Sequence, residues 1–574
     1  MTSTDEKKSI WKRKIKWPRP ISWVLHLLFS RKMLRFYLFA AACCLTLVIA
    51  FYTIENLRAS LAWSDHIEKL KAEGISTDYC DYIPPEIPDE ENLAKIPMFA
   101  AFEYERLPRK NKRTPWDVGE VQWKDESFGS LNNLSIYYRS KRNRRITQGL
   151  EKAEGRWQEA EPTDLQMLQI YYRGTNAVDL DLVQPRHKSI LTNKHTNDSW
   201  NRATNSFPFP KKPGSPSEDV LIALKNYDYI WEELKSASNQ RKQMRFPLHY
   251  DELFECLLPH LSHIKSLHRY GKLRATAELA SGRHQEATES IRMMMQINEG
   301  LRNETFFISH LVRIADLYFG IHPIWEGIHR HAFEPEDLQL LSSALEDVNF
   351  LAELPDLLRM ECSVFVATMG TMEKHRYSFY DHFGSGSFNE EQWPGNWTSI
   401  SYINLAPSGW FKQNMLYYSN ELRAIEGLIT DVIEMKPNAI RNFESHLNAS
   451  LKKPVTTYNV LAKQLYLYKN EASFYKTLTA ENTVRMVRTA IALERYYLKH
   501  QQYPEALGEL VPEFLNDIQL NLFSGNTFQY TREKEDRFRL HVSGWTSNRN
   551  DNENAPPQTN GELTWQWPLD SSQN

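Results

Sequence analysis

Cysteine is scarce in this sequence, with five residues among 574. Cys43 and Cys44 are adjacent within an apolar run, whereas Cys80, Cys256 and Cys362 stand far apart, so at most one disulfide could form among these three. The chain therefore has no disulfide framework, and we expect three free thiols that are mostly buried.

Sequence motifs of the common enzyme classes are missing as well. The chain has no P-loop, no Gly-x-Gly-x-x-Gly dinucleotide fingerprint, no Cys-x-x-Cys pair and no His-Glu-x-x-His zinc motif. The run FGSGS around Ser385 lacks the glycine spacing and the preceding strand of a nucleophile elbow. We therefore expect no cofactor, and the absent motifs favour a protein without enzymatic activity.

A large excess of charge of one sign is also absent, because the net charge is −3. Residues 1–35 nevertheless carry ten Lys and Arg against two Asp and Glu, a net charge of +8, which leaves −11 for the rest of the chain. A basic leader followed by an acidic body argues against nucleic acid as the main partner. The hydrophobic content of 41% and the charged content of 25% are typical of a globular protein.

One apolar run is long enough to cross a membrane. Phe36–Ile54 contains 19 residues without a charge, and a helix of this length rises about 28 Å, close to the thickness of the hydrocarbon core. Basic residues precede the run and Glu55 follows it. The positive-inside rule therefore predicts a cytoplasmic leader (1–35) and an extracytoplasmic, periplasmic body (55–574).

Two other interpretations of the apolar run fit the sequence less well. A cleaved signal peptide would have 35 residues before its apolar core and no small-x-small cleavage site after it. A lipoprotein signal ending at Cys43 would have seven apolar residues before the cysteine, and the run continues beyond it.

The first part of the body is predicted to be a helix followed by a spacer. Glu55–Ala72 is expected to leave the membrane as a helix that ends before Gly74. The residues expected near one apolar face of this helix are Leu57, Leu61, Ile67 and Leu70. Tyr82–Pro97 contains four prolines and is predicted to be an extended spacer.

Helices are predicted to dominate from about residue 163 to residue 500. Asp164 or Thr163 is a candidate N-cap for the first helix, and Ser217 for the second. The segment from Leu273 to Met294 resembles a tetratricopeptide-like helix hairpin, a unit that presents a concave face to partners when it is repeated. The positions that carry this similarity are Ala275, Leu279, Gly282, Ala287, Ile291 and Met294.

An aromatic, Gly- and Ser-rich segment, Ser378–Phe411, interrupts the helices. A long segment of this kind either covers the helical core or carries a function. If it covers a hydrolase site, the candidate catalytic residues are His375, Asp381, His382 and Glu390. This hypothesis requires the four side chains to converge in one pocket.

Two groups of histidines have spacings that suggest metal ligands. Cys256 and His260 are four positions apart and His263 follows three positions later, which would align them on a helix. His322 and His329, with Glu326 between them, would also share one helical face. Since no second cysteine or carboxylate completes a known motif, ordinary helix histidines are the alternative in both places.

The C-terminal region combines a long helix with short strands. The runs ALERYYLKHQQYPEALGELVPEFL, NLFSGNTFQYTRE, RFRLHVSGWTSN and GELTWQWP follow one another between residues 492 and 568. In this order they resemble the end of the globular part of type II secretion pseudopilins. The resemblance covers about residues 485–568 and implies a helix packed on about three antiparallel strands. The residues expected in the shared core are Val484, Val487, Ile491, Leu498, Phe528, Tyr530, Phe538 and Leu540.

The sequence departs from the pseudopilin pattern in three ways. Asn521-Leu522 stands where pseudopilins have Asp-Pro, and the prepilin start is missing, so the chain is not itself a pilin. The last loop keeps Asp551 and Glu553 but lacks glycines, so we do not expect it to bind calcium.

Most of the chain is similar to a family of uncharacterised bacterial membrane-anchored proteins. The similarity is carried by the Pro-rich spacer (Pro84–Phe99), ISHLVRIA (Ile308–Ala315), the APSGWF motif (Ala406–Asn414) and the YP tail motif (Tyr503–Leu515). It implies an N-terminal anchor and a helical body, and it carries no assigned activity.

The sequence therefore predicts a mainly α fold with an N-terminal transmembrane helix, a helical extracytoplasmic domain with a repeat-like hairpin, and a small α+β module. The expected segments are 1–35, 36–54, 55–110, 111–480, 481–569 and a tail at 570–574. The first functional hypothesis is a non-enzymatic module that binds a protein partner of the cell envelope. The alternatives are an envelope hydrolase and a secretion-linked subunit.

Overall fold

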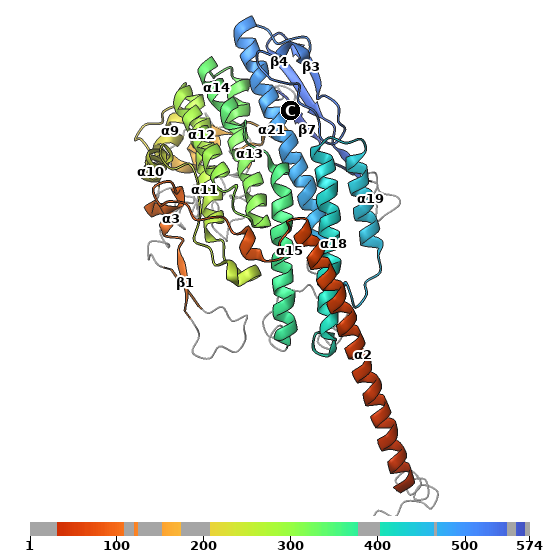
Figure 1. Ribbon diagram of the computed structural model, residues 1–574. Helices are drawn as coiled ribbons and strands as arrows, with labels where there is room; N and C mark the ends of the chain where they lie inside the picture. Colours follow the sequence, from red (N-terminus) through yellow and green to blue (C-terminus); the bar gives the residue numbers. More distant parts are fainter. Residues whose placement is uncertain are drawn as a thin grey trace, which may run out of the picture.

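The computed structural model describes residues 31–107, 120–123, 152–173, 207–376, 402–463, 468–547 and 558–568. Within these ranges the protein is mainly helical (Figure 1). The α-helices are α2 (Arg31–Ala72), α3 (Pro97–Ala100), α6 (Leu165–Arg173), α9 (Pro216–Leu224), α10 (Asp228–Ser238), α11 (Pro259–Ala280), α12 (His284–Gly300), α13 (Phe307–His329), α14 (Pro335–Ala344), α15 (Phe350–Lys374), α18 (Ser408–Ile433), α19 (Ala439–Lys452), α20 (Val460–Ala462) and α21 (Tyr468–His500).

Short 3-10 helices and strands connect and flank these helices. The 3-10 helices are η2 (Tyr79–Tyr82), η3 (Leu93–Lys95), η4 (Trp157–Glu159), η6 (Lys225–Tyr227), η7 (Tyr250–Glu255) and η9 (Leu507–Leu510). The strands are β1 (Tyr104–Leu107), β2 (Glu120–Trp123), β3 (Gln529–Lys534), β4 (Arg537–Val542), β5 (Trp545–Ser547), β6 (Gln558–Asn560) and β7 (Leu563–Trp565).

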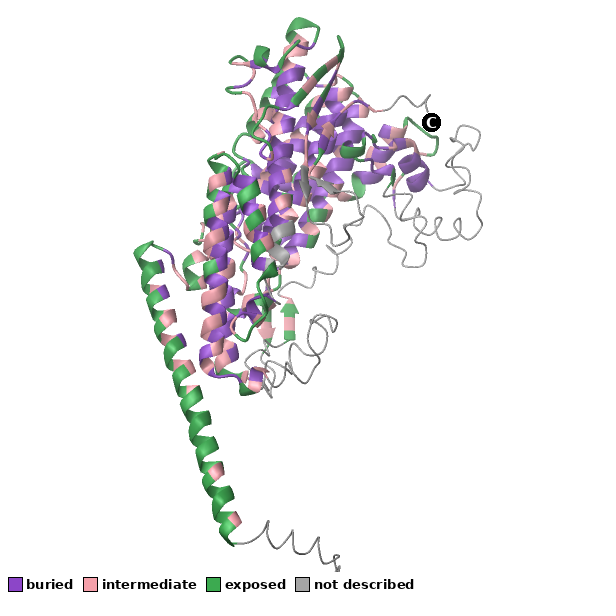
Figure 2. Cartoon of the chain, turned by 90° about the vertical axis from the view of Figure 1, so that its right-hand side faces the viewer, coloured by how far each residue is buried: buried purple, intermediate pink, exposed green. Residues whose placement is uncertain are grey.

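Helix α2 is one uninterrupted helix of 42 residues that contains the whole predicted membrane span. It is long and apolar enough to cross a membrane. Its N-terminal half projects from the body and is exposed, as Figure 2 shows. Its C-terminal half lies along α18. The predicted juxtamembrane helix is thus a continuation of the membrane helix, and the chain turns away at Gly74, where φ is +74°.

The apolar face predicted for the C-terminal half of α2 is wrong for two of its residues. Leu57 and Leu61 are 60% and 58% exposed, whereas Ala59, His66 and Leu70 are buried. The reason is that α2 approaches α18 through small and polar side chains, which leaves the two leucines on the opposite side.

The Pro-rich spacer is held against the body at several points. Asn92 accepts hydrogen bonds on its Oδ1 from the backbone N–H groups of Ala94 (3.0 Å) and Arg245 (2.9 Å). The guanidinium of Arg245 donates to the carbonyl oxygen of Pro84 (2.9 Å). Leu93 and Ile96 are buried. The prediction of an extended spacer is therefore wrong in part, because the segment includes turns and the 3-10 helix η3 and packs on the domain.

The N-termini of several helices follow their sequence signals. The Asp164 carboxylate accepts from the backbone N–H of Met167 at the start of α6, which confirms that cap (2.9 Å). Helix α9 is capped by Ser215, with Pro216 as its first residue, so the predicted cap at Ser217 is two positions too late.

The turn between α11 and α12 has the predicted features of a helix hairpin. The two helices pack on one another, and Gly282 occupies the turn with φ of +75°. Ala275, Ala287 and Ile291 are buried between the helices and their neighbours. These contacts form one hairpin in a helical body, and its likeness to a repeat remains a prediction.

The buried apolar side chains form two large clusters. The first draws residues from 93–350 together with residues from 480–567. The second draws mainly from 351–478. The C-terminal module, predicted to begin at residue 481, therefore shares its core with the N-terminal helices, and that predicted boundary lies inside α21.

The predicted C-terminal sheet is confirmed as a three-stranded antiparallel sheet of order β3-β4-β7. Leu540 lies opposite Tyr530 on one side and opposite Trp565 on the other. Phe538, Leu540 and Val542 alternate as buried residues of β4, as expected for a strand with one face on a core. Of the expected core residues, Val484, Val487, Ile491, Phe528, Phe538 and Leu540 are buried, while Leu498 and Tyr530 are partly buried.

Candidate functional site

Of the aromatic segment, the structure describes residues 402–411. His375 caps the C-terminus of α15, and Asp381, His382 and Glu390 lie outside the described residues. Next to His375, the guanidinium of Arg376 donates to the carbonyl of Ala406 and to the hydroxyl of Ser408 (2.8 Å). The end of the segment is thus fastened to the end of α15. Convergence of the four candidate catalytic residues remains a prediction.

The predicted alignment of Cys256 with His260 on one helix is wrong. Pro259 is the first residue of α11, so Cys256 precedes the helix. His260 is buried, stacks on Phe246 with ring centroids 4.0 Å apart, and lies 3.2 Å from Glu304 through its Nε2 atom. His263 contacts the carbonyl oxygen of Pro259 through its Nδ1 atom (2.9 Å).

Among the residues that the structure describes, no group of three or more His, Cys, Asp or Glu side chains is arranged to hold a metal ion. Burial also raises the pKa of Cys256 to about 12, so its sulfur is a neutral thiol near pH 7. A thiol is a poor metal ligand compared with a thiolate.

The second histidine group forms a buried polar cluster. The Nε2 atom of His322 lies 2.9 Å from Oε1 of Glu326, one helical turn away on α13. The same oxygen accepts from the backbone N–H of Thr163 (2.8 Å), and Oε2 of Glu326 accepts from Arg330 (2.6 Å). Burial lowers the pKa of His322 to about 4, so the ring is neutral near pH 7.

The carboxylate of Glu326 remains charged although it is buried. Burial acts to raise its pKa, but the hydrogen bond with His322 and the charge of Arg330 bring the pKa to about 2. His329, the third member, stacks on Trp325 and packs against Trp567 instead. All three residues lie on α13 as predicted, but His322 and Glu326 contact one another while His329 packs against the two tryptophans.

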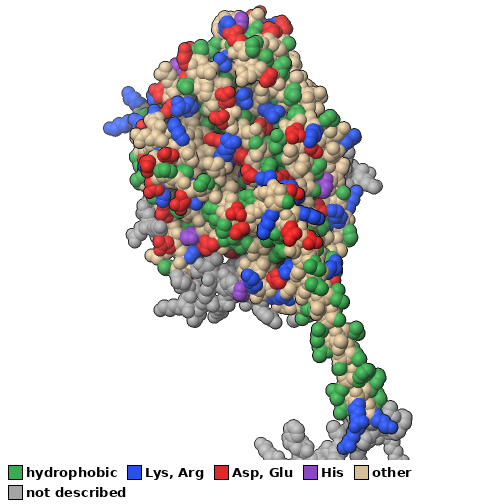
Figure 3. Space-filling view, in the orientation of Figure 1, with side chains coloured by type: hydrophobic (Ala, Val, Ile, Leu, Met, Phe, Trp, Pro, Cys, Tyr) green, Lys and Arg blue, Asp and Glu red, His purple; other side chains and the backbone are tan. Residues whose placement is uncertain are grey.

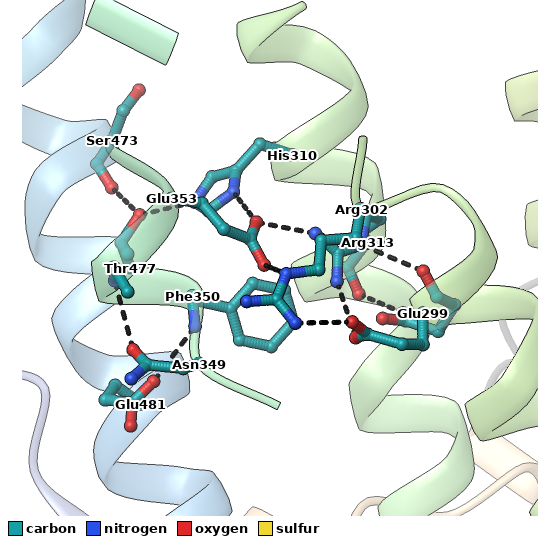
Figure 4. A network of polar contacts seen from close by, with 12 residues as sticks. Glu299, Arg302, His310, Arg313, Asn349, Phe350, Glu353, Ser473, Thr477 and Glu481 are labelled. Carbon is teal, nitrogen blue, oxygen red and sulfur yellow. Dashed lines mark hydrogen bonds and ion pairs between the residues drawn. The ribbon is translucent and has the colours of Figure 1, made fainter. Parts of the chain in front are cut away.

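Sequence reasoning missed a larger polar network, shown in Figure 4, between α12, α13, α15 and α21. The carboxylate of Glu353 accepts from Arg313 (2.5 Å) and lies 3.1 Å from His310. Arg313 is almost fully buried and also pairs with Glu299 (3.1 Å). His310 reaches Thr477 on α21 through its Nε2 atom (3.0 Å). The network thus ties four helices together.

Sequence reasoning also missed the contact surface between α2 and α18, which we call the anchor seam. The backbone N–H of Gly409 donates to Oδ1 of Asn56 (2.8 Å). A Cβ atom at position 409 would lie 2.5 Å from the carbonyl oxygen of Glu55 and 2.9 Å from Cβ of Ala59. Only glycine permits this approach, so α18 begins directly against α2.

Polar and aromatic side chains surround Glu55 at one end of the anchor seam. Oε2 of Glu55 accepts from Nε1 of Trp410 (3.0 Å) and from the hydroxyl of Tyr458 (3.0 Å), and it pairs with Arg58 (3.2 Å). Burial acts to raise the pKa of Glu55, but these hydrogen bonds hold it below its ordinary value. Glu55 is therefore a charged carboxylate near pH 7, and its hydrogen bonds contribute to the seam in that form.

At the middle of the seam, a histidine and a serine form a pair that resembles part of a catalytic dyad. Nε2 of His66 lies 2.8 Å from Oγ of Ser419, and Cys362 is nearby. Burial lowers the pKa of His66 and raises that of Cys362 to about 12. A neutral imidazole beside a hydroxyl has the composition required for nucleophilic catalysis.

The surroundings of this pair leave no room for a substrate. The adjoining cavity has a volume of about 20 Å³, which is enough for a single water molecule. Ser419 and His66 are both buried. The pair therefore acts as a polar contact that fixes α2 against α18.

A wider surface depression of about 410 Å³ lies where the chain leaves α2. Its lining includes Lys71, Asp78 and Asp81 along with apolar groups from Ile67 and Ile75. It is open to solvent and mixed in polarity, which suits contact with another molecule better than enclosed chemistry.

Comparison with known protein families, with curated proteins and with solved structures found no match to this chain. The described residues are therefore the evidence on function. Among them, the anchor seam determines how the candidate membrane helix is connected to the body.

Proposed function

We propose that this chain is a single-pass membrane protein of the cell envelope whose body binds a protein partner without catalysing a reaction. Residues 1–35 lie in the cytoplasm, α2 crosses the membrane, and residues 55–574 lie on the extracytoplasmic side. The observation that carries this proposal is the anchor seam, because it makes the membrane helix part of the folded body.

The seam fixes how the body is presented. Residues 55–72 of α2 extend about 27 Å beyond the predicted span, and contacts with α18 hold them from Gly409 to Ser419. A flexible linker would let the body turn freely, whereas this arrangement holds one end of it at the membrane. A fixed orientation suits a scaffold that offers a surface at a set height.

The buried polar clusters support the hypothesis that the protein binds a partner without catalysing a reaction. The His66–Ser419 pair, the Glu326 cluster and the Glu353 network are buried and are occupied by one another. Each of them joins helices. The partner surface we favour includes the face of the α11–α12 hairpin and the segment 378–411, with the pseudopilin-like module closing the far end of the body.

The experiment that tests the proposal is crosslinking in cells followed by affinity capture from solubilised membranes and mass spectrometry. The test variant replaces residues 378–400 with a short Gly/Ser linker and leaves 402–411 intact, because those residues fasten α15 to α18. A matched control replaces residues 179–204 with the same linker.

A discrete envelope partner that is lost in the 378–400 variant and kept in the control supports the proposal. No reproducible partner with any of the three chains contradicts it. In that case activity screens with His375→Ala, Asp381→Asn and His382→Ala variants would test the hydrolase alternative.

A further inference from the structure

Another part of the chain contacts α2 close to the end of its apolar run. Tyr52 is the third residue from the end of Phe36–Ile54, and its hydroxyl donates to the carbonyl oxygen of Leu405. The backbone that leads into α18 therefore lies beside the last turn of the predicted span. The lower ends of α15 and α18 lie at this level of α2 in Figure 1.

Two apolar side chains at this level are exposed. Leu405 is 66% exposed, and Val455 on the adjacent loop is 57% exposed. The loops are joined, since the hydroxyl of Tyr402 donates to the carbonyl oxygen of Thr457 (2.5 Å). Figure 3 shows hydrophobic side chains along the projecting half of α2 up to the point where it meets the body. Leu405 adjoins this part of α2 through its contact with Tyr52, and the loop that carries Val455 is joined to the backbone before α18 through Tyr402.

Aromatic rings mark the same level. Trp410 contacts the ring of Phe51 (6.3 Å between centroids) and stacks on Tyr402 (5.7 Å). Arg58 lies over the ring of Tyr458 (5.0 Å). Tyr and Trp, together with basic side chains, concentrate where a membrane protein passes from hydrocarbon to headgroups.

We propose that Leu405 and Val455 form a second membrane contact, inserted at the boundary between acyl chains and headgroups of the leaflet from which α2 emerges. The occupant of this surface is lipid, because the surface is continuous with the membrane-spanning part of α2 and carries an aromatic belt at the same height. The inference rests on the proposed membrane anchoring.

The contact would hold the body by two points on one leaflet. The anchor seam alone resists separation of α2 from α18, while a lipid contact at Leu405 and Val455 resists tilting of the body about α2. Apolar side chains that lie in the interface gain by leaving water. The same contact would keep the lower ends of α15 and α18 against the bilayer.

The test uses the full chain in phospholipid nanodiscs with the photoreactive residue p-benzoylphenylalanine at single positions. The test substitutions are Leu405→p-benzoylphenylalanine and Val455→p-benzoylphenylalanine. Leu45, within the apolar run, is the positive control. Leu340, 44% exposed on α14 at the opposite end of the body, is the matched control for an exposed leucine.

After irradiation, mass spectrometry should find phospholipid adducts at positions 45, 405 and 455 and none at 340. An adduct at 45 with no adduct at 405 and none at 455 overturns the inference and leaves the membrane anchor supported. Adducts at 340 as frequent as those at 405 also overturn it, because exposure alone would then explain them. A crosslink from position 405 to protein instead of lipid would also overturn the inference, because the occupant of this surface would then be a protein. No adduct at 45 contradicts the anchor and the inference together.

Discussion

Nε2 of His66 lies 2.8 Å from Oγ of Ser419, although the two residues are 353 positions apart in the chain. This contact belongs to the anchor seam, where the helix that carries the candidate membrane span joins the body. Because α2 is continuous, a change at the seam alters how the span and the body are connected.

The closest approach in the seam gives the first prediction. Gly409→Ala places a Cβ atom against the backbone of Glu55, so α2 and α18 must separate. Such overpacking costs about 1–3 kcal/mol, and we expect the melting temperature of the purified protein in detergent to fall.

Gly427→Ala is the matched control in the same helix, because nothing lies within 4 Å of its Cβ position. That change should stabilise α18 by about 0.5–1 kcal/mol, since alanine is the better helix former. Equal effects of the two substitutions would contradict a close seam.

A second prediction concerns acidification of the seam. Burial lowers the pKa of His66, and the charges of Lys69 and Arg423 act in the same direction while Glu73 opposes them. The unfolded chain, with a histidine pKa of about 6.5, therefore binds the proton more readily than the folded protein. Stability due to His66 is present above about pH 6.5 and is lost as the pH falls below it.

The measurement is the melting temperature between pH 7.5 and pH 5.0 for the native chain and for His66→Gln, which keeps a polar partner for Ser419. The native chain should lose more stability on acidification than the variant. Parallel curves would show that His66 does not titrate differently in the folded and unfolded states.

The sequence predicted the parts of this fold that depend on local patterns. The apolar run predicted the N-terminal half of α2, and the order of the C-terminal runs, through their resemblance to pseudopilins, predicted the three-stranded sheet with Phe538 and Leu540 in its core. The packed side of α2 could not be predicted, because it depends on Gly409 of a helix far away in the chain. Hydrophobicity alone favoured Leu57 and Leu61, which are exposed.

The candidate site shows the same limit. The spacing of His322 and Glu326 predicted that they share one face of a helix, and on α13 they are in contact. The spacing of Cys256 and His260 failed because Pro259 begins the helix between them. Ion pairs such as Arg313–Glu353 join separate helices, so no local spacing reveals them.

A third prediction tests the buried network of Figure 4. Glu353→Ala removes the carboxylate that pairs with Arg313 and leaves that buried guanidinium with Glu299 as its remaining ionic partner. Breaking a buried pair costs about 3–5 kcal/mol, and chemical unfolding should show a loss of this size. Glu159→Ala, in an exposed pair with Arg156, should cost less than about 1 kcal/mol. Similar losses in both variants would contradict a stabilising role of the buried Arg313–Glu353 pair.

A fourth prediction tests the proposed orientation. Cys80 is exposed in the part of the chain that we propose to be extracytoplasmic. Cys256 and Cys362 are less accessible, and burial raises the pKa of both to about 12, which slows their reaction as thiolates. A membrane-impermeant maleimide should therefore label intact spheroplasts, and Cys80→Ser should remove most of that label. Labelling that appears only after permeabilisation would place the body on the cytoplasmic side.

The fifth prediction concerns the contact between the helical body and the C-terminal module. Nδ1 of His331 lies 2.9 Å from one carboxylate oxygen of Glu494, and the other oxygen accepts from the hydroxyl of Tyr503 (2.5 Å). Burial acts to lower the pKa of His331, but the hydrogen bond and charge of Glu494, with Asp536, raise it above its ordinary value. The folded protein therefore binds this proton more readily than the unfolded chain.

The sign is opposite to that at His66. Stability from the His331–Glu494 pair is complete below the unfolded pKa of about 6.5 and is lost as the pH rises through the raised pKa of the folded protein. Glu494→Gln keeps an acceptor for Tyr503 but removes the charge, so the stability difference from the native chain should be largest near pH 5.5 and should shrink toward pH 8.5. In a His331→Asn background, which suits the left-handed backbone at this position (φ of +49°), the same substitution should have an effect that does not vary with pH. A difference that grows with pH, or one that varies equally in both backgrounds, would show that His331 does not carry the proton.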